Sequence, residues 1–119
     1  SGYHDEDSLA RSRELGSFFE TTMFLHLKIL TELLIPKASV FYWRTTTAKE
    51  VDFVVEQGKK LVAIEVKYSK KPVMNDIRNL LTFLEENPQT IRGVLVHAGS
   101  SIKWLHSKIL AVPWWWIVK

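Results

Sequence analysis

The sequence predicts an α/β fold in which helices flank a mixed β-sheet. Three observations support this: a helix with one apolar stripe opens the chain, three strand-like segments follow, and a strand–helix–strand step comes next. A tight hairpin joins antiparallel strands, whereas a strand–helix–strand step joins parallel ones, so the sheet should be mixed. The chain has 119 residues, 46% of them hydrophobic, which predicts a single domain over residues 1–119.

The opening helix is predicted from apolar residues that recur at steps of three and four. These residues are Leu15, Phe19, Met23, Leu27, Leu30 and Leu34. Ser8 is the expected N-cap, and Pro36 is expected to end the helix because proline disfavours helix in the residue before it. Residues 1–7 are expected to be disordered or left over from cloning.

Three strands are predicted after this helix from alternating, β-branched and aromatic residues. They span Val40–Arg44, Glu50–Glu56 and Leu61–Tyr68. In the second, Val51, Phe53 and Val55 should face one way and Glu50, Asp52, Val54 and Glu56 the other. Gly58 and Lys59 should form a two-residue hairpin turn, with glycine supplying a positive φ.

The second half of the chain predicts a helix and further strands. A helix over Asn75–Glu86 should bury Ile77, Leu80, Leu81 and Leu84 and stop at Asn87 and Pro88. A strand over Ile91–His97 and a turn over Ala98–Ser101 should follow. We then expect a short helix over Ile102–Ile109 and a last strand over Val112–Val118, with Pro113 at a sheet edge.

The hairpin fixes which side chains face each other. If Gly58 and Lys59 form the turn, Asp52 falls opposite Glu65 and Glu50 falls opposite Lys67, with facing Cβ atoms about 5 Å apart. Two carboxylates at that distance repel, and a divalent cation with oxygen ligands would relieve the repulsion. Lys67 lies on the same face as Glu65, where its ammonium would stabilise negative charge on a phosphoryl oxygen.

Three other interpretations fit the same spacing. Lys67 would simply neutralise Glu65, or Glu50 would pair with Lys67 across the strands. A register slip by one residue would place Asp52 and Glu65 on opposite faces of the sheet.

Glu20 is the third acidic residue of interest, because it borders the apolar stripe of the opening helix. Its neighbours one turn away, among them Ser17, Met23 and Phe24, include no basic residue. Its carboxylate would therefore seek a partner on the sheet or extend to solvent.

Four segments together resemble the PD-(D/E)XK nuclease superfamily. They are Phe18-Phe19-Glu20, Tyr42-Trp43-Arg44-Thr45, Glu50-Val51-Asp52-Phe53 and Ile64-Glu65-Val66-Lys67. In that superfamily a helical glutamate precedes a strand aspartate and a Glu-x-Lys motif on the next strand. The four segments in this order are most similar to the nuclease-like domain found C-terminal to prokaryotic AAA-type ATPases.

This resemblance implies a restriction-endonuclease-like core and a Mg²⁺ site, in which Mn²⁺ would substitute. Asp52, Glu65 and the Val66 carbonyl would bind the metal. Lys67 would assist the attacking water, and Glu20 would be an outer, water-mediated ligand. The expected reaction is hydrolysis of DNA phosphodiester bonds. The alternative is a catalytically idle module that docks a partner ATPase or nucleic acid.

Composition excludes several other classes of protein. The chain has no cysteine, which rules out disulfides and thiolate zinc sites. It has no apolar run long enough to span a membrane and no signal peptide, so we expect a cytoplasmic protein without a membrane partner. It also lacks a glycine-rich phosphate loop, which argues against ATP hydrolysis. The four histidines have no metal-ligand spacing, although His97 ends a predicted strand.

Charge and aromatic residues indicate partners. The net charge is +3, and lysines gather in the sequence at Lys59, Lys60, Lys67, Lys70 and Lys71, which suits a phosphodiester ligand. Trp114, Trp115 and Trp116 are unusual. On a last strand at least one would be exposed, which marks a surface for a homodimer or an ATPase partner ahead of base stacking. The other interpretation is an edge strand covered by a helix.

Overall fold

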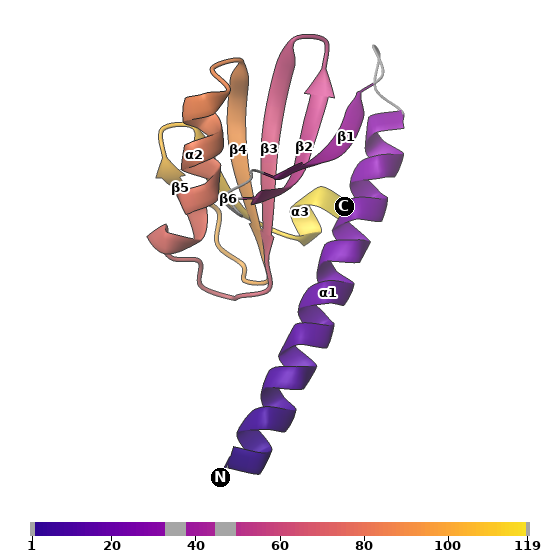
Figure 1. Ribbon diagram of the computed structural model, residues 1–119, viewed down its shortest axis with the longest axis vertical. Helices are drawn as coiled ribbons and strands as arrows, with labels where there is room; N and C mark the ends of the chain where they lie inside the picture. The colour runs from indigo at the N-terminus through magenta and orange to yellow at the C-terminus, as the bar shows by residue number, and fades with distance from the viewer. Residues whose placement is uncertain (1, 33–37, 45–49, 119) are drawn as a thin grey trace.

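The computed structural model describes residues 2–32, 38–44 and 50–118, with side chains for 11, 13–28, 38–44 and 50–116. Within these residues six strands form one sheet in the order β1-β2-β3-β4-β6-β5. The elements in chain order are α1 (Gly2–Glu32), β1 (Ser39–Arg44), β2 (Glu50–Gln57), β3 (Lys60–Lys67), the 3₁₀ helix η1 (Met74–Ile77), α2 (Arg78–Glu86), β4 (Thr90–His97), β5 (Lys103–His106), β6 (Ile109–Pro113) and α3 (Trp115–Val118) (Figure 1).

The sheet is mixed, as the sequence predicted. β1, β2 and β3 pair antiparallel, and β3 then pairs parallel with β4 across the connection that contains η1 and α2. β6 lies parallel beside β4, and β5 returns antiparallel along its outer side. The α/β fold class is therefore confirmed.

The β2–β3 hairpin has the expected turn and register. Gly58 adopts a φ of 62°, the left-handed region that glycine enters without strain. Gln57 pairs with Lys60, and the antiparallel register continues to Phe53 opposite Ile64. The alternative with a one-residue slip is thereby excluded over this part of the hairpin.

A β-bulge in β2 breaks the alternation expected there. Phe41 of β1 pairs with Val54 and Trp43 pairs with Val51, so β2 contains one extra residue between these pairs. Val51 and Val54 consequently pack into the same core, whereas Phe53 packs into the core on the other face of the sheet. The expectation that Val51 and Phe53 share a face was wrong, because it assumed an unbroken pleat.

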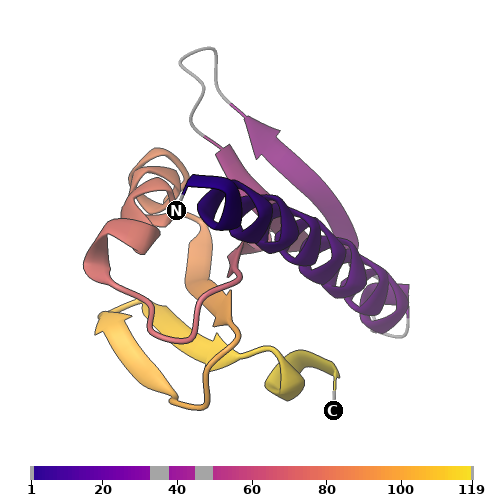
Figure 2. The ribbon, with the colours of Figure 1, turned by 90° about the horizontal axis from the view of Figure 1, so that it is seen from below.

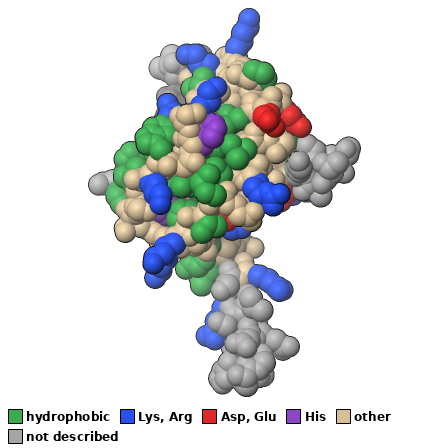
Figure 3. Space-filling model, turned by 90° about the vertical axis from the view of Figure 1, so that its left-hand side faces the viewer, with side chains coloured by type: hydrophobic (Ala, Val, Ile, Leu, Met, Phe, Trp, Pro, Cys, Tyr) green, Lys and Arg blue, Asp and Glu red, His purple; other side chains and the backbone are tan. Residues whose placement is uncertain are grey.

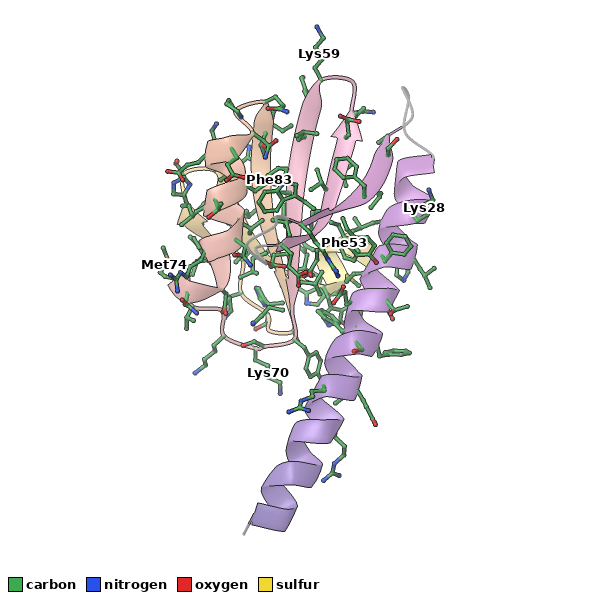
Figure 4. The ribbon with its side chains drawn as sticks, viewed as in Figure 1. Lys28, Phe53, Lys59, Lys70, Met74 and Phe83 are labelled. Carbon is green, nitrogen blue, oxygen red and sulfur yellow. The ribbon has the colours of Figure 1, made fainter. Side chains whose placement is uncertain are left out.

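Two apolar cores lie on opposite faces of the sheet. Figure 2 shows the helices that cover them, α2 and α1, on either side of the strands. Under α2, the buried side chains of Ile77, Leu80 and Phe83 pack against β2, β3 and β4. Under α1, Phe19 and Met23 pack against the other face, which includes Phe53. Phe83 and Phe53 mark the two cores in Figure 4. Both helices therefore hold the strands between them, and β2 and β3 are covered on each side.

Part of the apolar stripe predicted for α1 is buried. Phe19, Met23 and Leu27 are buried, but Leu15 is 49% exposed because the N-terminal half of α1 extends past the sheet (Figure 1). The helix begins at Gly2, so Ser8 lies inside it, and residues 2–7 form its first turns. The Leu30 side chain, Leu34 and Pro36 lie outside the described residues.

The C-terminal prediction needs correction. Residues 102–109 form no helix, because Lys103–His106 is the edge strand β5 and Ile109 begins β6. Pro113 ends an inner strand, at a point where the pairing of β5 has already ended at Ala111. The expected last strand stops there, and Trp115–Val118 is the short helix α3 beside α1. No helix in the described part of the chain has both the length and the apolar composition needed to cross a bilayer.

Candidate active site

A cleft of about 660 Å³ lies at the end of the sheet where β2 begins and β3 ends. One wall consists of charged side chains from α1, β2 and β3, namely Glu20, Glu50, Asp52, Glu65 and Lys67. The opposite wall consists mainly of polar side chains from η1 and α2, including Asn75, Asp76, Arg78, Asn79 and Thr82. Four of the residues predicted from sequence, Glu20, Asp52, Glu65 and Lys67, thus line one cleft.

Asp52 sits at the bulge of β2, and its carboxylate is held by the next strand. The Val66 N–H donates to Oδ2 of Asp52 at 2.8 Å. A backbone donor fixed within a strand orients this carboxylate more firmly than a flexible side chain would. This hydrogen bond links β2 to β3 beyond the paired residues Phe53 and Ile64.

Glu65 and Asp52 are in hydrogen-bond contact through their carboxyl groups. Burial raises the pKa of Glu65 to about 9, and the hydrogen bond and negative charge of Asp52 act in the same direction. A hydrogen bond from the Asp52 backbone and the nearby charge of Lys67 oppose the rise. At neutral pH, without a cation, Glu65 is therefore protonated, and its O–H donates a hydrogen bond to the Asp52 carboxylate.

Glu20 approaches this pair from α1. Its partial burial raises its pKa, and the charges of Asp52 and Glu50 raise it further, while Arg44 lowers it. Glu50 itself pairs with Arg44 of β1 at 3.1 Å. The alternative in which Glu50 pairs with Lys67 is therefore not the arrangement found, and Arg44 is engaged at the rim of the cleft.

Lys67 has a partner that the sequence did not indicate. Its Nζ lies 4.0 Å from Oδ1 of Asp76, whose side chain is 12% exposed compared with 55% for Lys67. The second carboxylate oxygen of Asp76 accepts the Val73 N–H at 2.8 Å at the start of η1. The ammonium of Lys67 thus lies at the edge of the cleft, near a largely buried carboxylate that also accepts a backbone N–H.

Two residues next to the ends of β3 and β4, Tyr68 and His97, do not line the cleft. Tyr68 packs edge-on against Phe19, with ring centroids 5.6 Å apart. His97 is fully buried, its Nδ1 accepts the Gly99 N–H at 3.0 Å and its Nε2 lies 2.9 Å from the Ser101 carbonyl. Its burial lowers its pKa, so it is a neutral residue that organises the turn after β4.

The lysine cluster expected from the sequence does not form in space. Lys59 lies at the hairpin turn, whereas Lys70 lies beyond the other end of β3 (Figure 4). The intervening strand separates them by about 23 Å, from the rise per residue of an extended chain. Of the five lysines, Lys67 is the one that lines the cleft.

The donor set fits a cation bound by two carboxylates. Asp52 and Glu65 touch each other in an open, polar cleft, and Mg²⁺ commonly takes one or two protein carboxylates and completes its shell with water and phosphate. Among the described residues no three His, Asp or Glu side chains are grouped closely enough to enclose a metal on their own.

The opposite wall was missed in the sequence, although a signal for it exists. Asn75, Arg78, Asn79 and Thr82 recur at helical steps of three and four, opposite the apolar stripe of the same segment. That polar stripe resembles any solvated helix face until the fold shows that it faces a cleft.

Comparison with known families shows which family the chain belongs to. A family model described as a domain of unknown function (DUF4143) matches residues 15–117, which is most of the chain. The chain is a member of the DUF4143 family. The match spans every element from the second half of α1 to α3, and therefore the whole of the cleft. No curated protein sequence matches this DUF4143 chain.

A solved structure shares the fold. The DUF4143 chain is similar to a chain in an assembly of Thermococcus gammatolerans McrB AAA+ hexamers with bound McrC, with a TM-score of 0.57 and 16% sequence identity. The alignment covers 82% of the DUF4143 chain and 27% of the other, so the protein corresponds to about a quarter of that chain's length. At this identity the likeness concerns the fold.

Proposed function

We propose that this DUF4143 chain is a PD-(D/E)XK-type nuclease domain that hydrolyses DNA phosphodiester bonds in the cytoplasm with Mg²⁺ or Mn²⁺. The observation that carries the proposal is the direct contact between Asp52 and Glu65 beside Lys67 in a polar cleft. Without a cation the two carboxyl groups stay in contact because Glu65 keeps a proton, and a cation bound between them would take the place of that proton.

The chain's own groups have distinct tasks in this proposal. Asp52, Glu65 and the Val66 carbonyl are the metal ligands, and Glu20 acts through a water molecule. Bound there, the divalent cation supplies charge that polarises the phosphate and makes water more acidic. Lys67 stabilises negative charge that develops on a phosphoryl oxygen, and its ion pair with Asp76 keeps its ammonium at the cleft.

The test begins with thermal unfolding in the presence and absence of Mn²⁺. A ligand that binds the folded state stabilises it by mass action, so Mn²⁺ at ten times its Kd should raise Tm by about 5 °C. Cleavage of an end-labelled DNA is then followed under the same conditions. Wild-type protein should show both effects.

Two variants of Asp52 separate metal binding from structure. Asp52→Ala leaves the partly buried Val66 N–H without its acceptor, whereas Asp52→Asn keeps a side-chain oxygen for it. Asp52→Asn should fold normally, lose the Mn²⁺-induced rise and lower the cleavage rate by at least about 100-fold. A variant that keeps both effects would refute the proposed site.

A second function is favoured by two observations of a different kind. The fold is shared with a chain from an assembly that contains AAA+ hexamers, and Trp114, Trp115 and Trp116 are each at least 36% exposed. In this alternative the domain docks an ATPase partner and the acidic pair is idle. Wild-type protein would then show no Mn²⁺-induced rise in Tm, and Trp116→Ser would weaken the partner complex without changing Tm.

A further inference from the structure

The wall formed by η1 and α2 contributes hydrogen-bond donors to the cleft that the acidic pair also lines. Ile77, Leu80 and Phe83 bury one side of this segment, and Asn75, Arg78 and Asn79 line the cleft on the other. We refer to these three polar residues as the α2 wall. Because they lie one helical turn apart or less, they form a continuous row along the cleft.

The groups of the α2 wall are available to a ligand. Arg78 is exposed, and within the described part of the chain it forms no ion pair. Its Nη1 donates to Oδ1 of Asn75 at 3.2 Å, which orients the guanidinium and occupies the oxygen of that amide. The NH₂ group of Asn75 and the remaining N–H groups of Arg78 are left as donors.

The charges of the two walls define what fits between them. The facing wall contributes Glu20, Asp52 and Glu65, which attract a cation. On the η1–α2 side Asp76 is paired with Lys67, and Arg78 attracts an anion. A ligand that satisfies both is a phosphate group that contacts a bound cation on one side and a guanidinium on the other. Arginine binds phosphate through paired N–H groups, and amide NH₂ groups donate to phosphate oxygens.

We infer that the α2 wall binds the sugar–phosphate backbone of the nucleic acid strand in the cleft, with Arg78 on a phosphate and Asn75 and Asn79 beside it. This inference rests on the proposed function, and it adds the surface that holds the substrate. Contacts to phosphates carry no base information, so binding should not depend on sequence.

The experiment measures binding of fluorescein-labelled 20-nucleotide DNAs by anisotropy, with Ca²⁺ present as an oxygen-bound cation. Arg78→Ala should weaken binding about tenfold, equally for a thymine-only and a mixed-sequence strand. The slope of log K against log salt concentration should become shallower by about one, since one phosphate contact is lost. Asn79→Ala should weaken binding by a smaller factor.

Arg92→Ala is the matched control. Arg92 is exposed and packs over the ring of Trp104 at 4.7 Å, away from the cleft, and its loss changes the net charge by the same amount. It should leave the affinity within about twofold of wild type. Equal weakening by Arg78→Ala and Arg92→Ala would overturn the inference, because only the total charge would then matter.

The outcomes separate the inference from the proposed function. If wild-type protein cleaves DNA and responds to Mn²⁺ but Arg78→Ala binds as wild type, the α2 wall is refuted while the metal site stands. If binding depends on Arg78 but Mn²⁺ has no effect on Tm or cleavage, backbone binding by the α2 wall is supported and metal-dependent hydrolysis is refuted. Absence of binding by wild type, or a loss confined to one sequence, refutes the backbone assignment.

Discussion

Glu65 lies within hydrogen-bond contact of Asp52 and titrates far above its ordinary range, with a pKa of about 9. The unfolded chain should release this proton near its ordinary value of 4.5. Between these two values the folded state binds more protons than the unfolded state, so stability falls as pH rises. The metal-free protein should therefore lose stability toward pH 9, by at most about 1.4 kcal/mol per pH unit.

The measurement is urea unfolding with EDTA between pH 7 and 9. This range lies above the titration of His97, whose lowered folded pKa gives the opposite trend, a stability that is lost as pH falls below about 6.5. Glu65→Gln should flatten the decline and be more stable than wild type at pH 9. An unchanged slope in the variant would mean that another group is responsible.

The position of the acidic pair could be predicted from the sequence, because a two-residue turn at Gly58 and Lys59 determines the register of the hairpin. The partner of Lys67 could not be predicted from the sequence. Asp76 reaches it from η1, after a loop whose path depends on the packing of the whole segment against the sheet. Local pairing therefore revealed the acids, whereas their surroundings required the tertiary fold.

At the scale of elements, the start of η1 depends on one carboxylate. Asp76 accepts the Val73 N–H at 2.8 Å and also faces Lys67. Asp76→Ala should lower the free energy of unfolding by about 1 kcal/mol, as loss of a helix cap does. Asp76→Asn retains an acceptor for Val73 and removes only the ion pair, which is partly exposed and should contribute little. Urea unfolding of both variants separates the two effects; equal losses would contradict the cap.

The loop after β3 is held by the loop after β4. Ala98 N–H donates to the Ser69 carbonyl at 2.8 Å, and Gly99 approaches the Lys70 carbonyl so closely that an added Cβ would overlap its oxygen. Gly99→Ala should therefore destabilise the domain by about 2 kcal/mol, because a backbone group must move. Gly16→Ala in α1 is the control.

Among the described residues no atom lies within 4 Å of a Cβ added at Gly16, so alanine there should stabilise α1 by up to about 1 kcal/mol. Thermal unfolding should thus move Tm in opposite directions for the two glycine variants. A Gly99→Ala protein as stable as wild type would show that the two loops adjust independently.

The elements differ in how well the sequence predicted them. Strands β1 to β4 and the η1–α2 segment were predicted because β-branched, aromatic and apolar residues are concentrated in them at strand or helix spacing. The bulge in β2 was not predicted. Its extra residue becomes visible only in the pairing of β2 with β1, and the alternating sequence gives no sign of it. The helix predicted over residues 102–109 was wrong for a related reason. Two strands of four and five residues, joined at Ser107 and Lys108, are too short to show a clear period.

Across the whole molecule, the charge of the cleft differs from that of the chain. The net charge is +3, and Lys and Arg side chains are spread over the face that carries α2 and β5 (Figure 3). The described lining of the cleft, in contrast, contains five acidic residues and two basic ones. Nucleic acid should therefore be attracted to the protein in general but repelled from the cleft until a cation binds there.

This contrast leads to a prediction about a variant that lacks both proposed ligands, Asp52→Asn with Glu65→Gln. In EDTA the wild-type pair shares one proton at neutral pH and carries one negative charge, which the double variant removes. The variant should bind DNA about fivefold more tightly than wild type in EDTA, an effect of about 1 kcal/mol for one charge near a phosphate. In Ca²⁺ the order should reverse, because only wild type can then bind the cation. Anisotropy titrations in the two buffers test both parts; a variant weaker than wild type in EDTA would show that the acidic pair does not repel the strand, and the cleft would lose its proposed dependence on a cation.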